Sequence, residues 1–165
     1  MHQHRITLLL TTLVASCAAG TAETDRFVQN LTLPTGQMIV VTEREFEPRS
    51  VGSYSVRLYS AANPRFPMDD FQAGLVQARD GYLDRTVLAD IDGDQHKEVI
   101  VIARSAGTSG YLSAQAFSIG TSARRVLFRS LWGLRSSVAD LPANADPIAA
   151  LGQALAADTE APRHF

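Results

Sequence analysis

The sequence has a single cysteine, Cys17, and a single lysine, Lys97, among its 165 residues. One cysteine cannot form an intramolecular disulfide, which excludes the class of small exported domains that disulfides hold together. With so few lysines, no basic stripe runs through the first hundred residues, and the formal net charge is -2. This charge distribution argues against nucleic-acid binding, which requires positive charge to neutralise a phosphate backbone.

Long apolar runs are also missing, because no segment after residue 22 approaches the ~20 residues of a membrane-spanning helix. The N-terminus has a positive head at residues 1–5, a short apolar run at residues 6–14 and small residues at 15–22. This three-part layout is typical of a secretory signal peptide. We predict that residues 1–22 are removed after Ala22 and that residues 23–165 form one exported, periplasmic domain.

A second processing site competes with the first. Residues 13–17 (LVASC) resemble a bacterial lipoprotein box, in which Cys17 would carry the lipid. Lipidation would tether the domain to the outer membrane without a spanning helix, and we expect membrane association only in that case. Cleavage after Ala22 instead leaves a mature chain without cysteine, whose core alone must stabilise it.

Short β-branched and apolar runs separated by turn signals dominate the predicted mature chain. The clearest alternation is in residues 46–60 (FEPRSVGSYSVRLYS), where Tyr54, Val56 and Leu58 share one face. A period of two with one apolar face indicates a half-buried antiparallel strand. Several such strands predict an all-β fold, an antiparallel β-sandwich or, alternatively, a barrel.

One helix is predicted near the C-terminus, at about residues 147–157. Asp146 can cap it, and Pro147 suits the first helical position. We expect the tail at residues 158–165 to fray. The predicted fold class is therefore an antiparallel β-sandwich with a short C-terminal helix.

Two connections are harder to interpret. Two prolines at residues 64 and 67 argue against regular structure between residues 61 and 73, and we expect Phe66 and Phe71 to anchor this connection to the core. Residues 121–130 (TSARRVLFRS) show no clear period, so we expect an exposed loop there.

An acidic turn joins two apolar runs at residues 87–89 and 99–103. Its carboxylates suit a hard cation, and calcium is the metal that they would bind. The spacing departs from an EF-hand, and Asp and Gly are also ordinary turn formers. We therefore predict no metal or other cofactor, and keep a calcium-stabilised envelope binding module as the alternative. Its ligands would be Asp90, Asp92, Asp94 and Glu98.

Evidence for catalysis is weak. The mature histidines are His96, in a turn, and His164, in the tail, and no nucleophile elbow is present. The carboxylates cluster in turns rather than in a facing pair. We therefore predict that the protein is not an enzyme; an enzyme that acts on cell-wall glycan is the alternative.

The segment at residues 105–111 (SAGTSGY) contains no large side chain before Tyr111. Composition alone indicates a glycine-containing hairpin loop with Tyr111 packed on its own sheet. A flexible, hydroxyl-bearing tip on a stiff hairpin could instead present side chains to a partner.

Three stretches in the same order resemble a known family: residues 46–60, the LADIDGD…EVIV hairpin, and RSAGTSGYLSA. They look like the bacterial periplasmic inhibitors of I-type (invertebrate-type) lysozyme, over roughly residues 31–117. The resemblance implies a β-sandwich, an I-type lysozyme as protein partner, and inhibition by insertion of a loop into its active-site cleft. The sequence is also compatible with a homodimer.

The inhibitory signature of that family, Ser-Gly-x-Tyr, maps by position onto Thr108, Ser109, Gly110 and Tyr111. Thr108 stands where serine is usual, and Ser109 where glycine is usual. Threonine keeps the hydroxyl but adds a methyl group. The resemblance thus implies that these four residues bind lysozyme.

Overall fold

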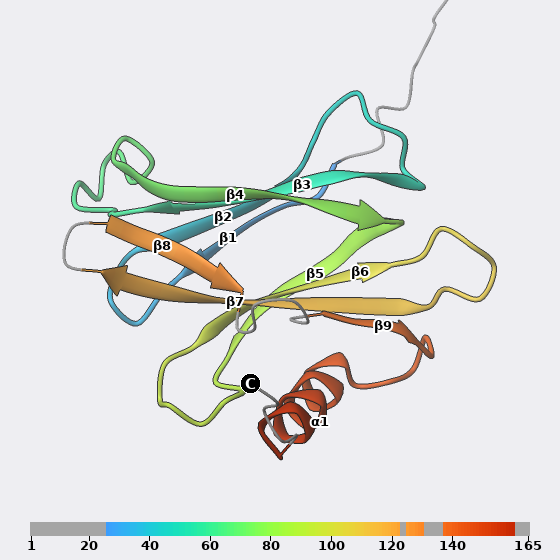
Figure 1. Ribbon diagram of the computed structural model, residues 1–165. Coiled ribbons are helices and arrows are strands. Elements are labelled where there is room, and N and C mark those ends of the chain that lie inside the picture. The colour runs from blue at the N-terminus through green and yellow to red at the C-terminus, as the bar shows by residue number, and fades with distance from the viewer. Residues whose placement is uncertain (1–25, 123–124, 131–136, 161–165) are drawn as a thin grey trace, which may run out of the picture.

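The computed structural model describes residues 26–122, 125–130 and 137–160 (Figure 1). The predicted signal peptide, its two processing sites and residues 161–165 lie outside the described residues. Within the described part of the chain, no helix is long and apolar enough to cross a membrane.

Two antiparallel sheets form the layers of a sandwich (Figure 1). The first sheet has the order β1-β2-β3-β4, in which neighbours along the chain are also neighbours in space. Its strands are β1 (Val28–Thr32), β2 (Met38–Glu43), β3 (Val51–Tyr59) and β4 (Phe71–Asp80). The architecture confirms the predicted sandwich.

The second sheet has the order β5-β6-β7-β8, and β9 also pairs with β7. Its strands are β5 (Tyr82–Ala89), β6 (Glu98–Arg104), β7 (Leu112–Ser122), β8 (Arg125–Ser130) and β9 (Ser137–Leu141). The helix α1 (Pro147–Glu160) follows β9 and lies on the side of this sheet that faces away from the first (Figure 1).

The predicted alternation in β3 defines the main core. Tyr54, Val56 and Leu58 are buried between the sheets, where they meet Val99 and Val101 of β6. The hydroxyl of Tyr54 reaches Gln115 of β7 through a hydrogen bond, and burial raises the pKa of Tyr54. A buried phenol with a polar partner joins the two sheets without leaving its oxygen unsatisfied.

The strand β6 is apolar on both faces because both faces are covered. Val99 and Val101 belong to the core between the sheets, whereas Ile100 and Ile102 pack in a second cluster with Leu151 of α1. A strand buried on both sides loses the polar alternation that marks a half-exposed strand. The helix therefore explains why this part of the sequence reads as a continuous apolar run.

The start of α1 agrees with its sequence signals. Asp146 Oδ1 accepts hydrogen bonds from the backbone N–H groups of Ile148 and Ala149, at 3.0 and 3.4 Å. The helix extends to Glu160, so the segment expected to fray from residue 158 is helical for three more residues.

The predictions for the connection at residues 61–73 were partly wrong, because β4 already begins at Phe71. Phe66 and Phe71 do not anchor the connection to the core: they are 51% and 57% exposed. The register places Phe71 opposite Tyr59, and the two rings meet edge to face at 5.9 Å between centroids. Within the alternating stretch at residues 46–60, the strand β3 runs from Val51 to Tyr59.

The segment at residues 121–130 is also different from the exposed loop that was expected. Residues 121–122 continue β7, and β8 pairs antiparallel with β7 from Phe117↔Ser130 to Ser122↔Arg125. Backbone pairing with a long neighbouring strand decides this structure, and three consecutive apolar residues at 126–128 concealed the period of two.

Candidate functional site

The loop at residues 105–111 joins β6 to β7 and forms a tight turn. The backbone N–H of Ser105 donates to the carbonyl oxygen of Tyr111 at 2.8 Å, which closes its base. The N–H of Gly110 donates to the Gly107 carbonyl oxygen at 3.1 Å, so Thr108 and Ser109 occupy the two central positions of a β-turn. Both residues are exposed, and the turn therefore presents two adjacent hydroxyl side chains to solvent.

The backbone of this turn suits the residues that this sequence carries. Gly110 has a φ of 56°, in the left-handed region that glycine adopts without steric cost. Thr108 and Ser109 are not among the non-glycine residues with positive φ. Serine at position 109 is therefore compatible with the turn.

Tyr111 is 46% exposed, although the next residue, Leu112, is buried beneath α1. Tyr111 lies outside the strand, because β7 begins at Leu112. Composition alone indicated that the ring packs on its own sheet. With 46% of Tyr111 exposed, the ring is not packed wholly onto that sheet.

An ion-pair network supports the loop from the side. Arg104, the last residue of β6, donates from Nη1 to the carbonyl oxygen of Gly110 at 3.3 Å and from Nε to Asp84 Oδ1 at 3.1 Å. The other carboxylate oxygen of Asp84 accepts from Arg85 Nη1 at 2.7 Å. Sequence reasoning missed Arg104 and Asp84, because only strand pairing brings β5 beside the loop.

The acidic hairpin at residues 90–98 lies at the other end of β6. The structure brings together Asp90, Asp92 and Glu98, whose oxygens lie within 4.8 Å of one another, and leaves Asp94 outside this group. Asp90 accepts hydrogen bonds from the N–H groups of Gly93 and Gln95, at 2.7 and 2.9 Å. The carboxylates thus cap the turn, as Asp side chains commonly do.

Glu98 is the buried member of this group. Burial raises the pKa of its carboxyl group, the nearby charges of Asp92 and Asp94 raise it further, and the hydrogen bond from the Ile91 N–H opposes the shift. That bond, to Glu98 Oε2, is 3.0 Å long. Glu98 therefore has a structural partner in the backbone.

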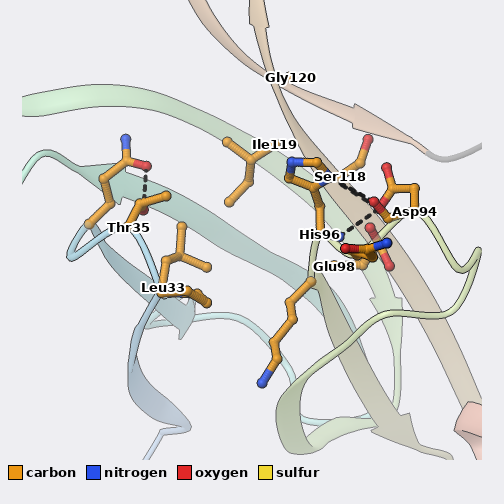
Figure 2. Close-up of a pocket in the computed structure, with 12 residues that line it drawn as sticks. Leu33, Thr35, Asp94, His96, Glu98, Ser118, Ile119 and Gly120 are labelled. Carbon is orange, nitrogen blue, oxygen red and sulfur yellow. Dashed lines mark hydrogen bonds and ion pairs between the residues drawn. The ribbon is translucent and has the colours of Figure 1, made fainter.

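A pocket of about 510 Å³ adjoins this hairpin, between the β1–β2 turn and β7 (Figure 2). His96 and Asp94 contact each other at its rim, with Nδ1 3.4 Å from Oδ1. Its walls include Leu33, Thr35, His96, Glu98, Ile119 and Gly120. The pocket is separated from the 105–111 loop by the length of β6.

Known proteins are similar to the part of the chain that forms the sandwich and most of α1. Residues 25–155 match the family model described as "Periplasmic lysozyme inhibitor of I-type lysozyme". A solved relative, the inhibitor PliI-Ah from Aeromonas hydrophila, is 44% identical, with a TM-score of 0.66; the match covers 76% of this chain and 98% of that one. A. hydrophila PliI, solved in complex with Meretrix lusoria lysozyme, is 45% identical, with a TM-score of 0.63, over 76% and 94% of the two chains. No curated protein matches.

Proposed function

This chain belongs to the family of periplasmic lysozyme inhibitors of I-type lysozyme, and we propose that it inhibits by inserting its 105–111 loop into the active-site cleft of the enzyme. Membership makes it a periplasmic protein inhibitor and not an enzyme.

The observation that carries this proposal is the geometry of the loop tip. Thr108 and Ser109 are exposed at the centre of a hydrogen-bonded turn, and Tyr111 is 46% exposed beside them. Arg104 braces the turn through the Gly110 carbonyl oxygen. A braced tip loses little conformational entropy when it binds, which favours affinity.

The chemistry of the target suits these side chains. A retaining glycosidase holds two carboxyl groups about 5–5.5 Å apart, one protonated and one ionised. A hydroxyl group can donate to the ionised carboxylate and accept from the protonated one. The hydroxyl groups of Thr108 and Tyr111 would occupy the site of the sugar, and the Tyr111 ring would add buried apolar area. The inhibitor itself breaks no bond.

A panel of lysozymes tests the proposal. The purified mature protein is titrated into turbidity assays of lysing cells with I-type, chicken-type and goose-type lysozymes. We expect the I-type enzyme to be inhibited at a far lower concentration than the other two. Equal inhibition of all three, or of none, would contradict the proposal, and lysis by the protein alone would favour the glycan-cleaving enzyme instead.

A further inference from the structure

Phe46 is the most exposed large hydrophobic residue of the described chain, at 98%. It lies in the loop between β2 and β3 (residues 44–50), and its φ is 61°. A side chain with a Cβ adopts this left-handed conformation at a steric cost, and Phe has no polar group to offset it. Both the ring in water and the backbone conformation are unfavourable for the isolated protein, which suggests that they serve a contact outside it.

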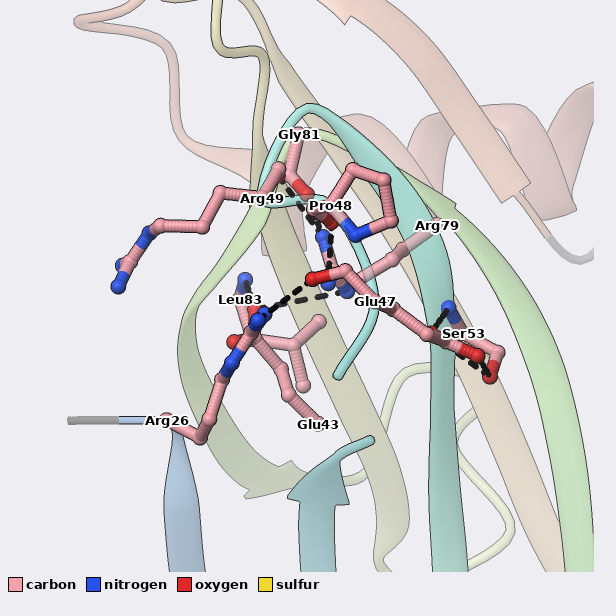
Figure 3. A network of polar contacts seen from close by, with 9 residues as sticks. All are labelled: Arg26, Glu43, Glu47, Pro48, Arg49, Ser53, Arg79, Gly81 and Leu83. Atoms are coloured by element: carbon pink, nitrogen blue, oxygen red, sulfur yellow. Dashed lines mark hydrogen bonds and ion pairs between the residues drawn. The ribbon is translucent and has the colours of Figure 1, made fainter. Parts of the chain in front are cut away.

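The chain that follows Phe46 is fixed by Glu47 (Figure 3). Glu47 Oε2 accepts from the Ser53 N–H at 2.5 Å, and Oε1 accepts from the Ser53 hydroxyl at 2.9 Å. These hydrogen bonds lower the pKa of Glu47. The carbonyl oxygen of Glu47 accepts from Arg26 Nη2 at 2.5 Å. The loop is therefore closed by polar contacts to β3 and to the start of the first sheet.

A buried arginine holds the rest of the loop from below. Arg79 is 4% exposed, and its guanidinium donates to the carbonyl oxygens of Pro48 and Arg49 at 3.1 and 2.9 Å (Figure 3). Its Nε lies 3.6 Å from Glu43 Oε1, which neutralises the buried charge. Because this network fixes the loop, Phe46 stays in its strained, exposed position without a partner.

The loop that carries Phe46 shares its base with the 105–111 loop. The Ser50 carbonyl oxygen accepts from the Gly81 N–H at 2.7 Å. Gly81 also packs against the start of the 105–111 loop, because a Cβ there would lie 1.9 Å from the Arg104 carbonyl oxygen. The guanidinium of Arg49 lies over the Tyr82 ring at 5.8 Å. Both loops thus project from the same end of the sandwich (Figure 1).

We propose that Phe46 is a second lysozyme-binding residue, whose ring packs on an apolar surface beside the cleft that the 105–111 loop enters. This inference rests on the proposed function, since it assigns the same lysozyme molecule to both loops. Interfaces favour aromatic anchors, because a ring buries a large area with few rotatable bonds. A rigid loop that already holds the ring in place avoids the entropic cost of ordering it on binding.

The test compares Phe46→Asn with Phe66→Asn in the mature protein. Asparagine tolerates the left-handed conformation, so Phe46→Asn removes the ring without straining the loop. Phe66 is a matched control, because it is also exposed but lies in the β3–β4 connection at the opposite end of β3. Affinity for an I-type lysozyme is measured by calorimetry, and Tm by thermal unfolding. We expect Phe46→Asn to weaken binding roughly tenfold with an unchanged or higher Tm, and Phe66→Asn to bind within twofold of the parent.

A second variant, Phe46→Gly, guards against a failure of the asparagine variant to fold, since glycine relieves the φ strain altogether. Binding within twofold of the parent for both Phe46 variants, while Tyr111→Ala loses affinity, would overturn this inference and leave the proposed function in place. Full affinity of Tyr111→Ala would instead remove the 105–111 loop from the mechanism. Equal weakening by Phe66→Asn would also overturn the inference.

Discussion

The guanidinium of Arg104 donates a hydrogen bond to the carbonyl oxygen of Gly110 at 3.3 Å. Gly110 directly precedes Tyr111 and carries the left-handed φ that ends the turn. Asp84 of β5 fixes the same guanidinium from the other side at 3.1 Å. Arg104 therefore contacts the backbone immediately before Tyr111.

Arg104→Gln should weaken lysozyme binding about threefold to tenfold, because the loop must then be ordered on binding. Asp84→Asn should weaken binding less, because it removes the ion pair with the Arg104 guanidinium but leaves that guanidinium in place. Surface plasmon resonance with an I-type lysozyme measures both. The double variant separates the two effects. If Asp84 acts only through Arg104, the affinity of the double variant should equal that of Arg104→Gln. Additive losses of affinity would contradict this coupling.

Tyr111→Ala should reduce inhibition by about thirtyfold or more, the loss expected when a central aromatic anchor is removed. The Tm should change little, because nearly half of the ring is already exposed. Tyr111→Phe separates the contribution of the hydroxyl group from that of the ring. Inhibition that is unchanged in Tyr111→Ala would contradict the proposed role of the loop.

Thr108→Ala should weaken inhibition by about threefold to tenfold, through loss of one hydroxyl hydrogen bond worth about 1 kcal/mol. Thr108→Ser should retain the effect of the parent, since it keeps the hydroxyl. The matched control is Thr35→Ala. Thr35 is also an exposed threonine, but it lies in the turn between β1 and β2. Equal losses from Thr35→Ala and Thr108→Ala would indicate a general effect on the protein and not a contact.

Gly81→Ala should lower the free energy of unfolding by about 3 kcal/mol, because Gly81 combines a positive φ with close backbone packing. Its φ is 85°, and a Cβ would lie 1.9 Å from the Arg104 carbonyl oxygen. Gly36→Ala is the control: its φ is 86°, but nothing lies within 4 Å of the added Cβ. We expect a loss of only about 1 kcal/mol there, measured by urea denaturation. Equal losses at both sites would exclude the close contact as the cause.

The buried carboxyl group of Glu98 should make stability depend on pH. Its pKa is raised in the folded protein, chiefly by burial. The folded state therefore binds the proton more tightly, and this stabilisation is complete below the pKa of the unfolded chain and lost as the pH rises through the folded-state pKa. Glu98→Gln should consequently have a higher Tm than the parent at pH 7, with the two values converging near pH 4.

The control for this comparison is Glu45→Gln, at an exposed glutamate in the loop at residues 44–50. It should leave the pH profile of Tm unchanged. A difference between Glu98→Gln and the parent that is the same at every pH would show that packing, and not ionisation, is responsible.

Calcium should not be needed for stability. The Asp90 carboxylate already accepts two backbone hydrogen bonds, and Glu98 accepts one. We expect the Tm to be the same with a chelator and with millimolar calcium. A Tm that rises with calcium concentration as mass action requires would instead support the calcium-stabilised module.

Much of the fold follows from local patterns. The alternation of Tyr54, Val56 and Leu58 identifies the core face of β3, and Asp146 with Pro147 places the start of α1. These features depend on a period of two and on backbone capping, which neighbouring residues determine. Likewise, the stretches that resemble the family identify the loop at residues 105–111.

Other features depend on contacts between segments distant in the sequence. Arg79 is buried because Glu43 and three backbone carbonyl groups surround its guanidinium. Phe46 and Phe71 are both exposed, although each is a large apolar side chain. The sequence by itself determined the core face of β3 and the start of α1. Only the tertiary structure decided which faces are buried and which loops meet, because burial depends on long-range packing that no local period encodes.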